Sequence, residues 1–390
     1  MKHIAILGST GSIGKNALSV VETHPDEFKV VGLAANRDVD TLEAQIRTHR
    51  PKVAALNERA AAAQLRERIR DMNGTEVLAG TEGLQAVATV DEAAQVLEGI
   101  GGSAGLFPTL AAIDAGKDIA FVNKEVMVMC GPLVMEAVRA KGVNLIPIDG
   151  EMSAIFQCLE GQRARQADIH QLLITASGGP FRAMPVEALR NVTPQQALRH
   201  PNWDMGAKIT IDSATMMNKG LEVIEAKWLF DVPLSKINIV VHRESIVHSM
   251  VEWTDGCTLA QLGATDMRVM IQYALTYPRR LATPVPRLDL LAARTLHFEP
   301  VDVDKFPCIS LAYTAAEVGG TLPVVLSSAD EVVVDAFLAN RIRFTDIPAI
   351  LRSVMDKHAV IPRPNLDDIL AVDAWAKSAA RECIKKQNNI

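Results

Sequence analysis

Several features that mark whole classes of protein are scarce in this sequence. The 390 residues contain five cysteines, an odd number spread from Cys130 to Cys383 with no CxxC pair, so neither a disulfide framework nor a cysteine zinc site is indicated. No apolar stretch reaches the about 18 residues that a membrane helix needs. Met1-Lys2-His3 leads directly into a strand-like run rather than a signal peptide. We therefore expect a cytoplasmic protein.

A surplus of positive charge is also lacking. The chain carries 40 Lys and Arg against 46 Asp and Glu, a formal net charge of −6, and the basic residues are spread along it rather than massed. Nucleic acid and anionic membranes are therefore not expected partners. A small molecule is the expected ligand.

The length and pattern of the chain predict several domains. A chain of 390 residues that is 48% hydrophobic is longer than one domain with a single hydrophobic core usually is. Over the first 150 residues short apolar runs alternate with helical patterns, including a helix over Arg59–Met72, which predicts a parallel α/β sheet with helices on both faces. We assign residues 1–149 to a Rossmann-like domain with strands at Ile4–Leu7, Val30–Ala34, Val53–Leu56, Ile119–Val122 and Leu145–Ile148.

The remaining sequence has a different texture. Residues 150–277 are expected to form an α+β catalytic domain, with strands at Gln171–Ala176, Lys208–Ile211, Ile237–Val241 and His248–Glu252. Five prolines make residues 278–307 a predicted linker. Residues 308–390 are expected to form a helical domain, with helices over Ser310–Val318, Glu331–Asn340, Thr345–His358 and Leu366–Lys386.

Three glycines lie at the turn after the first predicted strand, in the run Gly8-Ser-Thr-Gly11-Ser-Ile-Gly14. The spacing is GxxGxxG rather than the GxGxxG of most NAD enzymes. Small residues there still let backbone N–H groups approach a pyrophosphate at the positive end of a helix dipole. A tight turn without a ligand is the alternative, but the position between strand and helix favours a dinucleotide.

The end of the second predicted strand indicates which dinucleotide is bound. It reads Ala34-Ala35-Asn36-Arg37 and lacks the acidic residue that binds the ribose 2′-OH of NAD. An arginine with a neutral neighbour favours the 2′-phosphate of NADPH. Taken alone, Arg37 is equally a solvated surface charge, and only its place in the chain favours the functional interpretation.

Acidic residues indicate a metal site. Asp149 and Glu151 lie two apart after an apolar strand, so extended backbone would point both carboxylates to one side. Together with Glu222 they would make an oxygen-rich site for a hard cation such as Mg²⁺ or Mn²⁺ rather than for zinc. An acidic pair at this spacing is also common on solvated strand ends, so the neighbouring polar motifs carry the argument.

Donors suited to a sugar phosphate occur in the same part of the chain. Backbone amides, hydroxyls and an ammonium are offered by Ser177-Gly178-Gly179, Ser213, Asn218 and Lys219. Ser-Gly-Gly is equally a plain turn, and Asn218-Lys219-Gly220 is equally a helix end or loop.

Taken together, these segments resemble the 1-deoxy-D-xylulose 5-phosphate reductoisomerase family over the whole chain from Gly8. The most specific piece is the fifteen-residue run Lys208-Ile-Thr-Ile-Asp-Ser-Ala-Thr-Met-Met-Asn-Lys-Gly-Leu-Glu222. The glycine turn, Asn123-Lys-Glu125, Thr175-Ala-Ser-Gly-Gly-Pro-Phe-Arg182 and Ser245-Ile-Val-His-Ser-Met250 add to it.

The resemblance implies a homodimeric reductoisomerase that uses NADPH and a divalent cation, Mg²⁺, Mn²⁺ or Co²⁺, to convert 1-deoxy-D-xylulose 5-phosphate into 2-C-methyl-D-erythritol 4-phosphate for isoprenoid precursors. By the same resemblance, NADPH would contact Thr10, Gly11, Ser12, Ile13, Asn36, Arg37, Asn123, Glu125 and Gly206, and the metal would be held by Asp149, Glu151 and Glu222. The sugar phosphate would be held by Lys124, Glu151, Ser177, His200, Ser213, Asn218, Lys219 and Glu222. Trp203 would belong to a flap over the substrate, and His248 to the wall of the site.

The chain departs from the family pattern at a few positions. Gly150 and Met152 stand where the family usually has Ser and His, which bears on substrate identity or turnover more than on the fold. Ser327-Ser-Ala-Asp-Glu331 stands where the family has Asn-Ala-Ala-Asn-Glu. The alternatives are therefore a paralogue acting on another phosphorylated sugar and a non-catalytic protein that binds NADPH or a sugar phosphate.

Overall fold

The computed structural model describes residues 1–161, 166–203 and 205–388. The chain forms two compact units. The first unit consists of Met1–Asn123, Leu133–Ser153 and Asp266–Arg287, and the second holds the other described residues. Helices α6 (Lys124–Lys141) and α7 (Gly150–Leu159) each contribute residues to both units. Among the described residues, no helix combines the length and apolar character needed to cross a membrane.

A seven-stranded sheet in which all neighbouring strands are parallel forms the first unit. Its order is β4-β3-β2-β1-β5-β6-β7. The strands are β1 (Lys2–Leu7), β2 (Phe28–Ala35), β3 (Val53–Leu56), β4 (Glu76–Ala79), β5 (Gln95–Glu98), β6 (Asp118–Phe121) and β7 (Leu145–Pro147). The order along the chain reverses between β1 and β5, and the crevice outside the carboxyl ends of strands at such a reversal is where open α/β sheets bind ligands.

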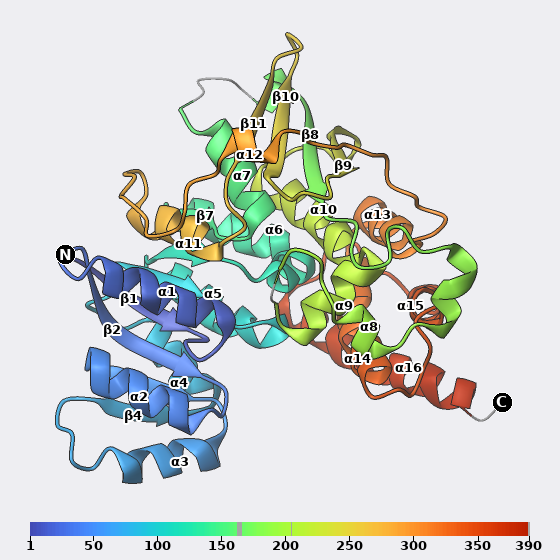
Figure 1. The fold of residues 1–390 in the computed structure, drawn as a ribbon. Coiled ribbons are helices and arrows are strands. Elements are labelled where there is room, and N and C mark those ends of the chain that lie inside the picture. The colour runs from blue at the N-terminus through green and yellow to red at the C-terminus, as the bar shows by residue number, and fades with distance from the viewer. Residues whose placement is uncertain (162–165, 204, 389–390) are drawn as a thin grey trace. The chain divides into compact units, whose positions relative to one another are not determined.

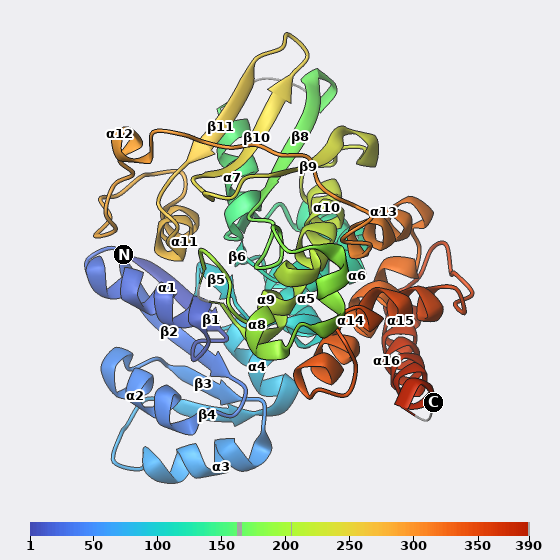
Figure 2. The ribbon, with the colours of Figure 1, turned by 45° about the vertical axis from the view of Figure 1, so that its right-hand side comes forward.

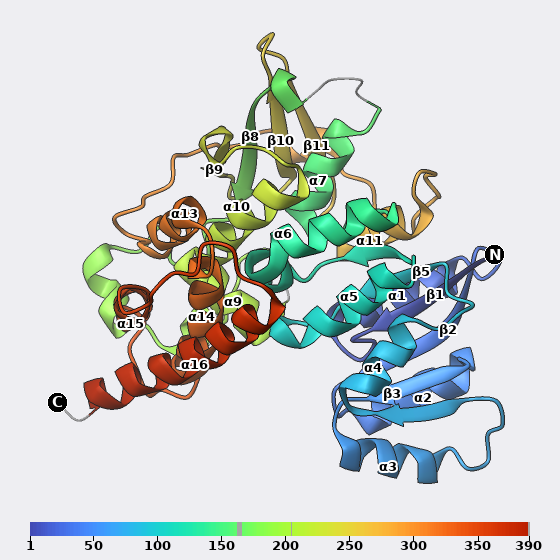
Figure 3. The same cartoon turned by 180° about the vertical axis from the view of Figure 1, so that it is seen from behind.

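Helices cover both faces of this sheet (Figure 1, Figure 3). One face carries α1 (Ser12–Thr23), α2 (Val39–His49) and α3 (Arg59–Arg68), and the other carries α4 (Gly80–Ala88) and α5 (Leu106–Asp114). Since both faces are covered, the strands are runs of buried apolar residues without alternation, as in Ile4 to Leu7. A late segment, α11 (Met267–Thr276), packs on α1, where Gln272 Oε1 lies 3.1 Å from His24 Nε2.

A mixed four-stranded sheet of order β11-β10-β8-β9 lies in the second unit, as Figure 2 shows. The strands are β8 (Ile169–Ala176), β9 (Ile237–Val241), β10 (Val247–Trp253) and β11 (Thr258–Leu262); β8 and β9 are parallel, and the other pairs are antiparallel. The longer helices of this unit are α9 (Ala207–Thr215), α10 (Met217–Leu229), α13 (Cys308–Val318), α14 (Leu322–Leu338), α15 (Asp346–Met355) and α16 (Leu366–Asn388). Helices α13, α15 and α16 all pack against α14, which is buried along most of its length. The short helices α8 (Pro194–Ala197) and α12 (Leu290–Ala293) lie in connecting segments.

The predicted fold class is confirmed, since the chain has a parallel Rossmann-like sheet, a second α+β region and C-terminal helices. One predicted strand was wrong: Lys208–Ile211 lies in helix α9. Its polar–apolar alternation matches a strand over four residues. Over the full segment, however, Ile211, Ala214 and Thr215 are buried at helical spacing, and Lys208 and Asp212 form an ion pair four residues apart.

Three short strands were also missed. β4 has four residues, β5 begins and ends with the buried polar residues Gln95 and Glu98, and β11 lies at the edge of its sheet and is only partly buried. In each case too few apolar residues occur in sequence to distinguish a strand from a loop.

Candidate active site

The glycine-rich turn follows β1 at the reversal point of the parallel sheet. Gly8 has a φ of 77°, and a Cβ there would lie 2.4 Å from the carbonyl oxygen of Gly99. A Cβ on Gly14 would lie 2.4 Å from the carbonyl oxygen of Gly8, whereas one on Gly11 would meet only that oxygen, at 3.3 Å. Gly8 and Gly14 are therefore required by the packing of the turn itself. Gly11 is exposed, so the packing of the turn does not require it to be glycine, and the absence of a side chain leaves room for a ligand to approach.

Helix α1 begins directly after this turn. Its N-cap residue is Gly11, no side chain caps it, and its first turn contains no acidic residue. An anion at this end would meet backbone N–H groups and the positive end of the helix dipole. The predicted contact residues Thr10 to Ile13 lie here.

Asn36 and Arg37 lie exposed just after β2. The acidic residue that follows them, Asp38, is the N-cap of α2, and its carboxylate accepts a hydrogen bond from the Thr41 backbone N–H at 3.1 Å. This hydrogen bond lowers the pKa of Asp38. Because the Asp38 carboxylate caps its own helix, the exposed Arg37 is the charged residue next to Asn36 that could contact a ligand at the end of β2.

Polar residues also follow β5 and β6 at the same edge of the sheet. The buried Asn123 amide donates to the carbonyl oxygens of Ile100 at 2.5 Å and Gly102 at 3.0 Å. Glu98, at the end of β5, accepts a hydrogen bond from the Ile100 N–H at 3.0 Å. The carboxyl end of β6 thus places the predicted residue Asn123 at the same edge of the sheet as the glycine-rich turn after β1 and Asn36 after β2.

Asp149 and Glu151 follow β7, but the geometry predicted for them was wrong. The backbone does not continue as a strand, because α7 begins at Gly150 and Glu151 lies in its first turn. One oxygen of Asp149 accepts a hydrogen bond from the Gly150 N–H at 3.0 Å. The start of a helix therefore places these carboxylates, and negative charge is favoured there by the helix dipole.

Glu222 is fully buried on α10 and contacts two lysines and an amide. Lys124 Nζ lies 2.9 Å from Oε1, and Lys219 Nζ lies 2.6 Å from Oε2. Asn218 Nδ2 donates to Oε1 at 2.6 Å, and Asn218 Oδ1 accepts from Lys124 at 2.8 Å. Four predicted site residues therefore form one buried charged cluster, in which two cations surround one anion.

Three carboxylates that could hold a metal ion lie close together. One oxygen from each of Asp149, Glu151 and Glu222 lies within 4.8 Å of the others. All the donors are carboxylate oxygens, which hard divalent cations prefer, and none is a thiolate or imidazole. The residues present therefore fit the predicted cation.

Ser177, His200 and Ser213 lie around the loop after β8. Ser177 Oγ is 3.0 Å from His200 Nε2, and it accepts a hydrogen bond from the Gly179 N–H at 3.2 Å. A Cβ on Gly179 would lie 2.6 Å from the Ser213 carbonyl oxygen, and Gly179 has a φ of 65°. The Ser-Gly-Gly turn therefore packs directly against α9 at Ser213, as a shared phosphate site would require.

Trp203 and His248 lie beside each other, with ring centroids 6.2 Å apart. His248 is buried in β10, and Trp203 precedes α9, whose N-cap residue is the predicted cofactor contact Gly206. Asn202, which the sequence analysis did not single out, donates to Ser245 Oγ at 2.7 Å and to the Arg243 carbonyl at 2.8 Å. The only feature of the sequence that could have indicated Asn202 was its position between His200 and Trp203.

Two histidines of the site are held neutral. Burial lowers the pKa of His200 to about 4, and Lys219 adds to the effect. Burial likewise lowers the pKa of His248 to about 4. Backbone N–H groups of Asn202 and Trp203 donate to His200 Nδ1, so the proton is on Nε2 and is donated to Ser177.

Lowered histidine pKa values predict how stability depends on pH. A histidine whose pKa falls from 6.5 unfolded to about 4 folded stabilises the protein above pH 6.5 and loses that contribution as the pH falls toward 4. We expect the thermal midpoint to drop over this window and the drop to be smaller in His200→Gln. The measurement is a series of thermal melts from pH 7.5 to 4; equal slopes for the two proteins would contradict a neutral, buried His200.

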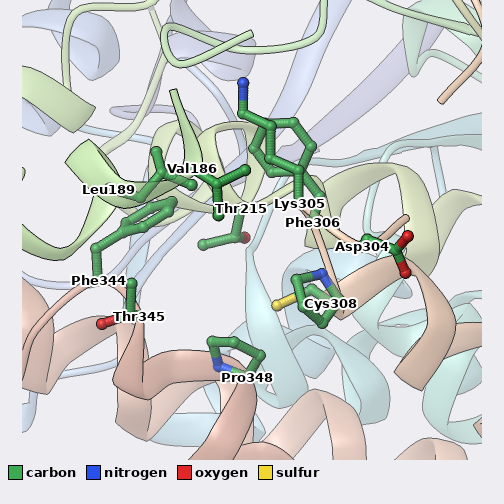
Figure 4. A pocket seen from close by; sticks show the side chains of 11 residues that line it. Val186, Leu189, Thr215, Asp304, Lys305, Phe306, Cys308, Phe344, Thr345 and Pro348 are labelled. Carbon is green, nitrogen blue, oxygen red and sulfur yellow. The ribbon is translucent and has the colours of Figure 1, made fainter. Parts of the chain in front are cut away.

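A separate pocket of about 180 Å³ lies elsewhere in the second unit (Figure 4). Val186, Leu189, Phe306, Phe344 and Pro348 give it a mainly apolar lining. The Lys305 ammonium is bound to the carbonyl oxygens of Arg182 and Met184 at 2.7 and 2.6 Å. The pocket is smaller than the roughly 300–1,000 Å³ of typical ligand sites, and it is not a candidate for a sugar phosphate.

The chain matches three family models in sequence order. They are 1-deoxy-D-xylulose 5-phosphate reductoisomerase at residues 4–131, its C-terminal domain at residues 145–230, and the DXP reductoisomerase C-terminal domain at residues 262–379. The 1-deoxy-D-xylulose 5-phosphate reductoisomerase of Prosthecochloris aestuarii is 53% identical over 97% of this chain and 99% of its own length. The chain belongs to the 1-deoxy-D-xylulose 5-phosphate reductoisomerase family.

Solved structures of this family have the same fold. The reductoisomerase of Zymomonas mobilis in complex with NADPH is 40% identical, with a TM-score of 0.92 over 98% of this chain and 99% of that one. A reductoisomerase in complex with NADPH, fosmidomycin and magnesium is 39% identical, with a TM-score of 0.95 over 99% of this chain and 98% of that one. The enzyme of Chlorobaculum tepidum is 50% identical over 98% of this chain and the whole of its own.

Proposed function

We propose that this chain is an NADPH-dependent reductoisomerase that converts 1-deoxy-D-xylulose 5-phosphate into 2-C-methyl-D-erythritol 4-phosphate. The observation that carries the proposal is the group of three carboxylates, Asp149, Glu151 and Glu222. Lys124 and Lys219 form ion pairs with Glu222. Relatives about half identical over their full length bear the name of this reaction. Solved relatives hold NADPH and magnesium.

In the proposed site the three carboxylates hold the divalent cation, Mg²⁺, Mn²⁺ or Co²⁺. When bound, such a cation supplies Lewis-acid polarisation of the substrate carbonyl. Lys124 and Lys219 form ion pairs with Glu222 and balance part of the charge of the three carboxylates. Lys124, Glu151 and Glu222 would also touch the reacting end of the substrate.

The phosphate of the sugar is assigned to donors at the other end of the site. Hydroxyl, amide and ammonium donors are supplied by Ser177, Ser213, Asn218 and Lys219. His200 supplies an Nε2–H, which in this structure donates to Ser177 Oγ. Because His200 stays neutral at pH 7, it acts there as a hydrogen-bond donor rather than as a cation. Trp203 and His248 would form the flap and wall that exclude water from reactive intermediates.

The cofactor is assigned to the carboxyl edge of the parallel sheet. The pyrophosphate would lie at Thr10 to Ile13, where the first turn of α1 has no side-chain cap. Asn36 and Arg37 would bind the 2′-phosphate. Asn123, Glu125 and Gly206 would complete the nicotinamide side.

A cofactor-oxidation assay tests the proposed function. Purified protein with NADPH and Mg²⁺ is expected to oxidise NADPH when 1-deoxy-D-xylulose 5-phosphate is added and to stop when a chelator is added. Turnover only with another sugar phosphate would indicate the paralogue instead. A Cβ on Gly150 would meet nothing closer than Met270 Cε at 3.9 Å, so Gly150→Ser fits sterically and tests whether the missing hydroxyl changes substrate choice.

Arg37→Ala tests the assignment of the 2′-phosphate. Losing one charge-assisted contact should raise the KM for NADPH roughly tenfold or more and leave that for NADH unchanged. Steady-state kinetics with both cofactors gives the comparison, with Arg59→Ala at the start of α3 as a control. An unaltered KM for NADPH would mean that Arg37 is only a surface charge.

We further propose that the protein is a cytoplasmic homodimer, with a cofactor domain at residues 1–149, a catalytic domain at 150–277, a linker at 278–307 and a helical domain at 308–390. The resemblance to the family supports the dimer. The molar mass from light scattering on the purified chain tests it, and a monomer would reject it.

A further inference from the structure

A second buried group of charges lies in the second unit, centred on Lys208 in the first turn of α9. Its Nζ lies 2.7 Å from Asp212 Oδ2, 2.9 Å from Asp330 Oδ2 and 3.3 Å from Glu125 Oε1. The Asp212 and Asp330 side chains are 2% and 0% exposed. One ammonium therefore joins three helices, because Glu125 lies on α6, Asp212 on α9 and Asp330 on α14.

Electrostatics make this lysine the element that holds the group together. Burial alone would lower the pKa of Lys208, but Asp212, Asp330 and Glu125 raise it well above its ordinary value, so the ammonium stays charged. Burial and the neighbouring Asp330 raise the pKa of Asp212. Three carboxylates around one cation would repel each other without it.

The group reaches the site in two ways: through Glu125, which is itself proposed to contact the cofactor, and through the chain neighbours of its members. Glu125 directly follows Lys124, whose ammonium contacts Asn218 and Glu222. Asp212 directly precedes Ser213, against whose carbonyl Gly179 packs. A displacement of Lys208 would therefore shift the backbone at the start of α6 and in α9, which carry Lys124 and Ser213.

We propose that Lys208 is a positioning residue for the reaction, because its contacts with Glu125, Asp212 and Asp330 fix the helix segments that present Lys124 and Ser213. It touches neither substrate nor cofactor in this role. The effect on turnover rests on the proposed function, whereas the effect on the backbone at the start of α6 does not.

Lys208→Met tests the proposal against a matched lysine. Lys227 on α10 is also half-buried, but its ammonium donates to the Ala316 carbonyl at 2.9 Å instead of to carboxylates. Both Lys208→Met and Lys227→Met are expected to lower the melting temperature. Only Lys208→Met should reduce kcat at least tenfold and speed amide hydrogen exchange tenfold at Val128 to Cys130, whose N–H groups close the first turns of α6.

Lys208→Arg keeps the charge and should recover most of the lost kcat. If Lys208→Met does not fold, Lys208→Gln, whose amide can still donate to one carboxylate, is measured in the same way. Equal behaviour of the Lys208 and Lys227 variants in kcat and exchange would overturn the proposal and leave Lys208 as a structural residue. Absence of turnover in the unmodified protein would reject the proposed function, and the exchange data would still decide the role of Lys208.

Discussion

Replacing Glu222 with glutamine is expected to reduce metal-dependent turnover by roughly 10³-fold, because a cation that polarises a carbonyl contributes several kcal/mol to the transition state. The substitution keeps the size of the side chain and removes its charge. Lys124 and Lys219, at 2.9 and 2.6 Å, then lose the anion that they share. The measurements are kcat with saturating Mg²⁺ and the affinity for Mn²⁺ by calorimetry.

A neighbouring glutamate provides the control for this prediction. Glu225 is also buried on α10, three residues further along, and is not one of the three grouped carboxylates. Glu225→Gln should cost stability and keep both turnover and Mn²⁺ binding. Folding of each variant is checked by circular dichroism. Unchanged turnover in Glu222→Gln would reject its role as a metal ligand.

Two alanine substitutions in the glycine-rich turn are expected to have opposite consequences. In Gly14→Ala the new Cβ would lie 2.4 Å from the backbone of Gly8 and Ser9, so the turn must move, and we expect a loss of about 3 kcal/mol in stability. In Gly11→Ala the nearest atom is 3.3 Å away and the residue is exposed, so the fold should remain. The methyl group would then stand where the pyrophosphate approaches.

Thermal melts and NADPH titrations of both variants separate the two effects. Gly11→Ala should retain its melting temperature and bind NADPH roughly tenfold or more weakly, about the loss of one charge-assisted hydrogen bond. Gly14→Ala should melt at a lower temperature with or without cofactor. If Gly11→Ala binds NADPH normally, the pyrophosphate does not lie at this turn.

Local patterns predicted much of the parallel sheet. The five predicted strands of the first unit all overlap strands of the structure, because buried parallel strands are continuous apolar runs bounded by turns. The prediction of secondary structure failed where a short segment fits both the period of a strand and the period of a helix. Ile209 and Ile211 alternate as in a strand, whereas Ile211, Ala214 and Thr215 are buried at the spacing of the helix that Ala207–Thr215 forms.

The carboxylates also show that a short segment does not determine its own backbone conformation. The sequence predicted Asp149, Glu151 and Glu222 as oxygen ligands of a metal ion, and it predicted extended backbone for the first two. In the structure, α7 starts between them. The charged group around Lys208 was not anticipated at all, because Glu125, Asp212 and Asp330 are distant from one another in sequence and belong to three different helices.

The sequence by itself determined which residue types are available for the proposed site and in which order: a glycine turn proposed for the dinucleotide, a neutral residue and an arginine proposed for its 2′-phosphate, and acidic and basic residues proposed for a metal and a phosphate. These are properties of side chains and short runs, which do not depend on long-range contacts. Tertiary structure alone decided that Lys124 meets Glu222 and that Lys208 gathers three carboxylates. Such contacts depend on how helices pack, and packing is set by the whole buried surface rather than by any one segment.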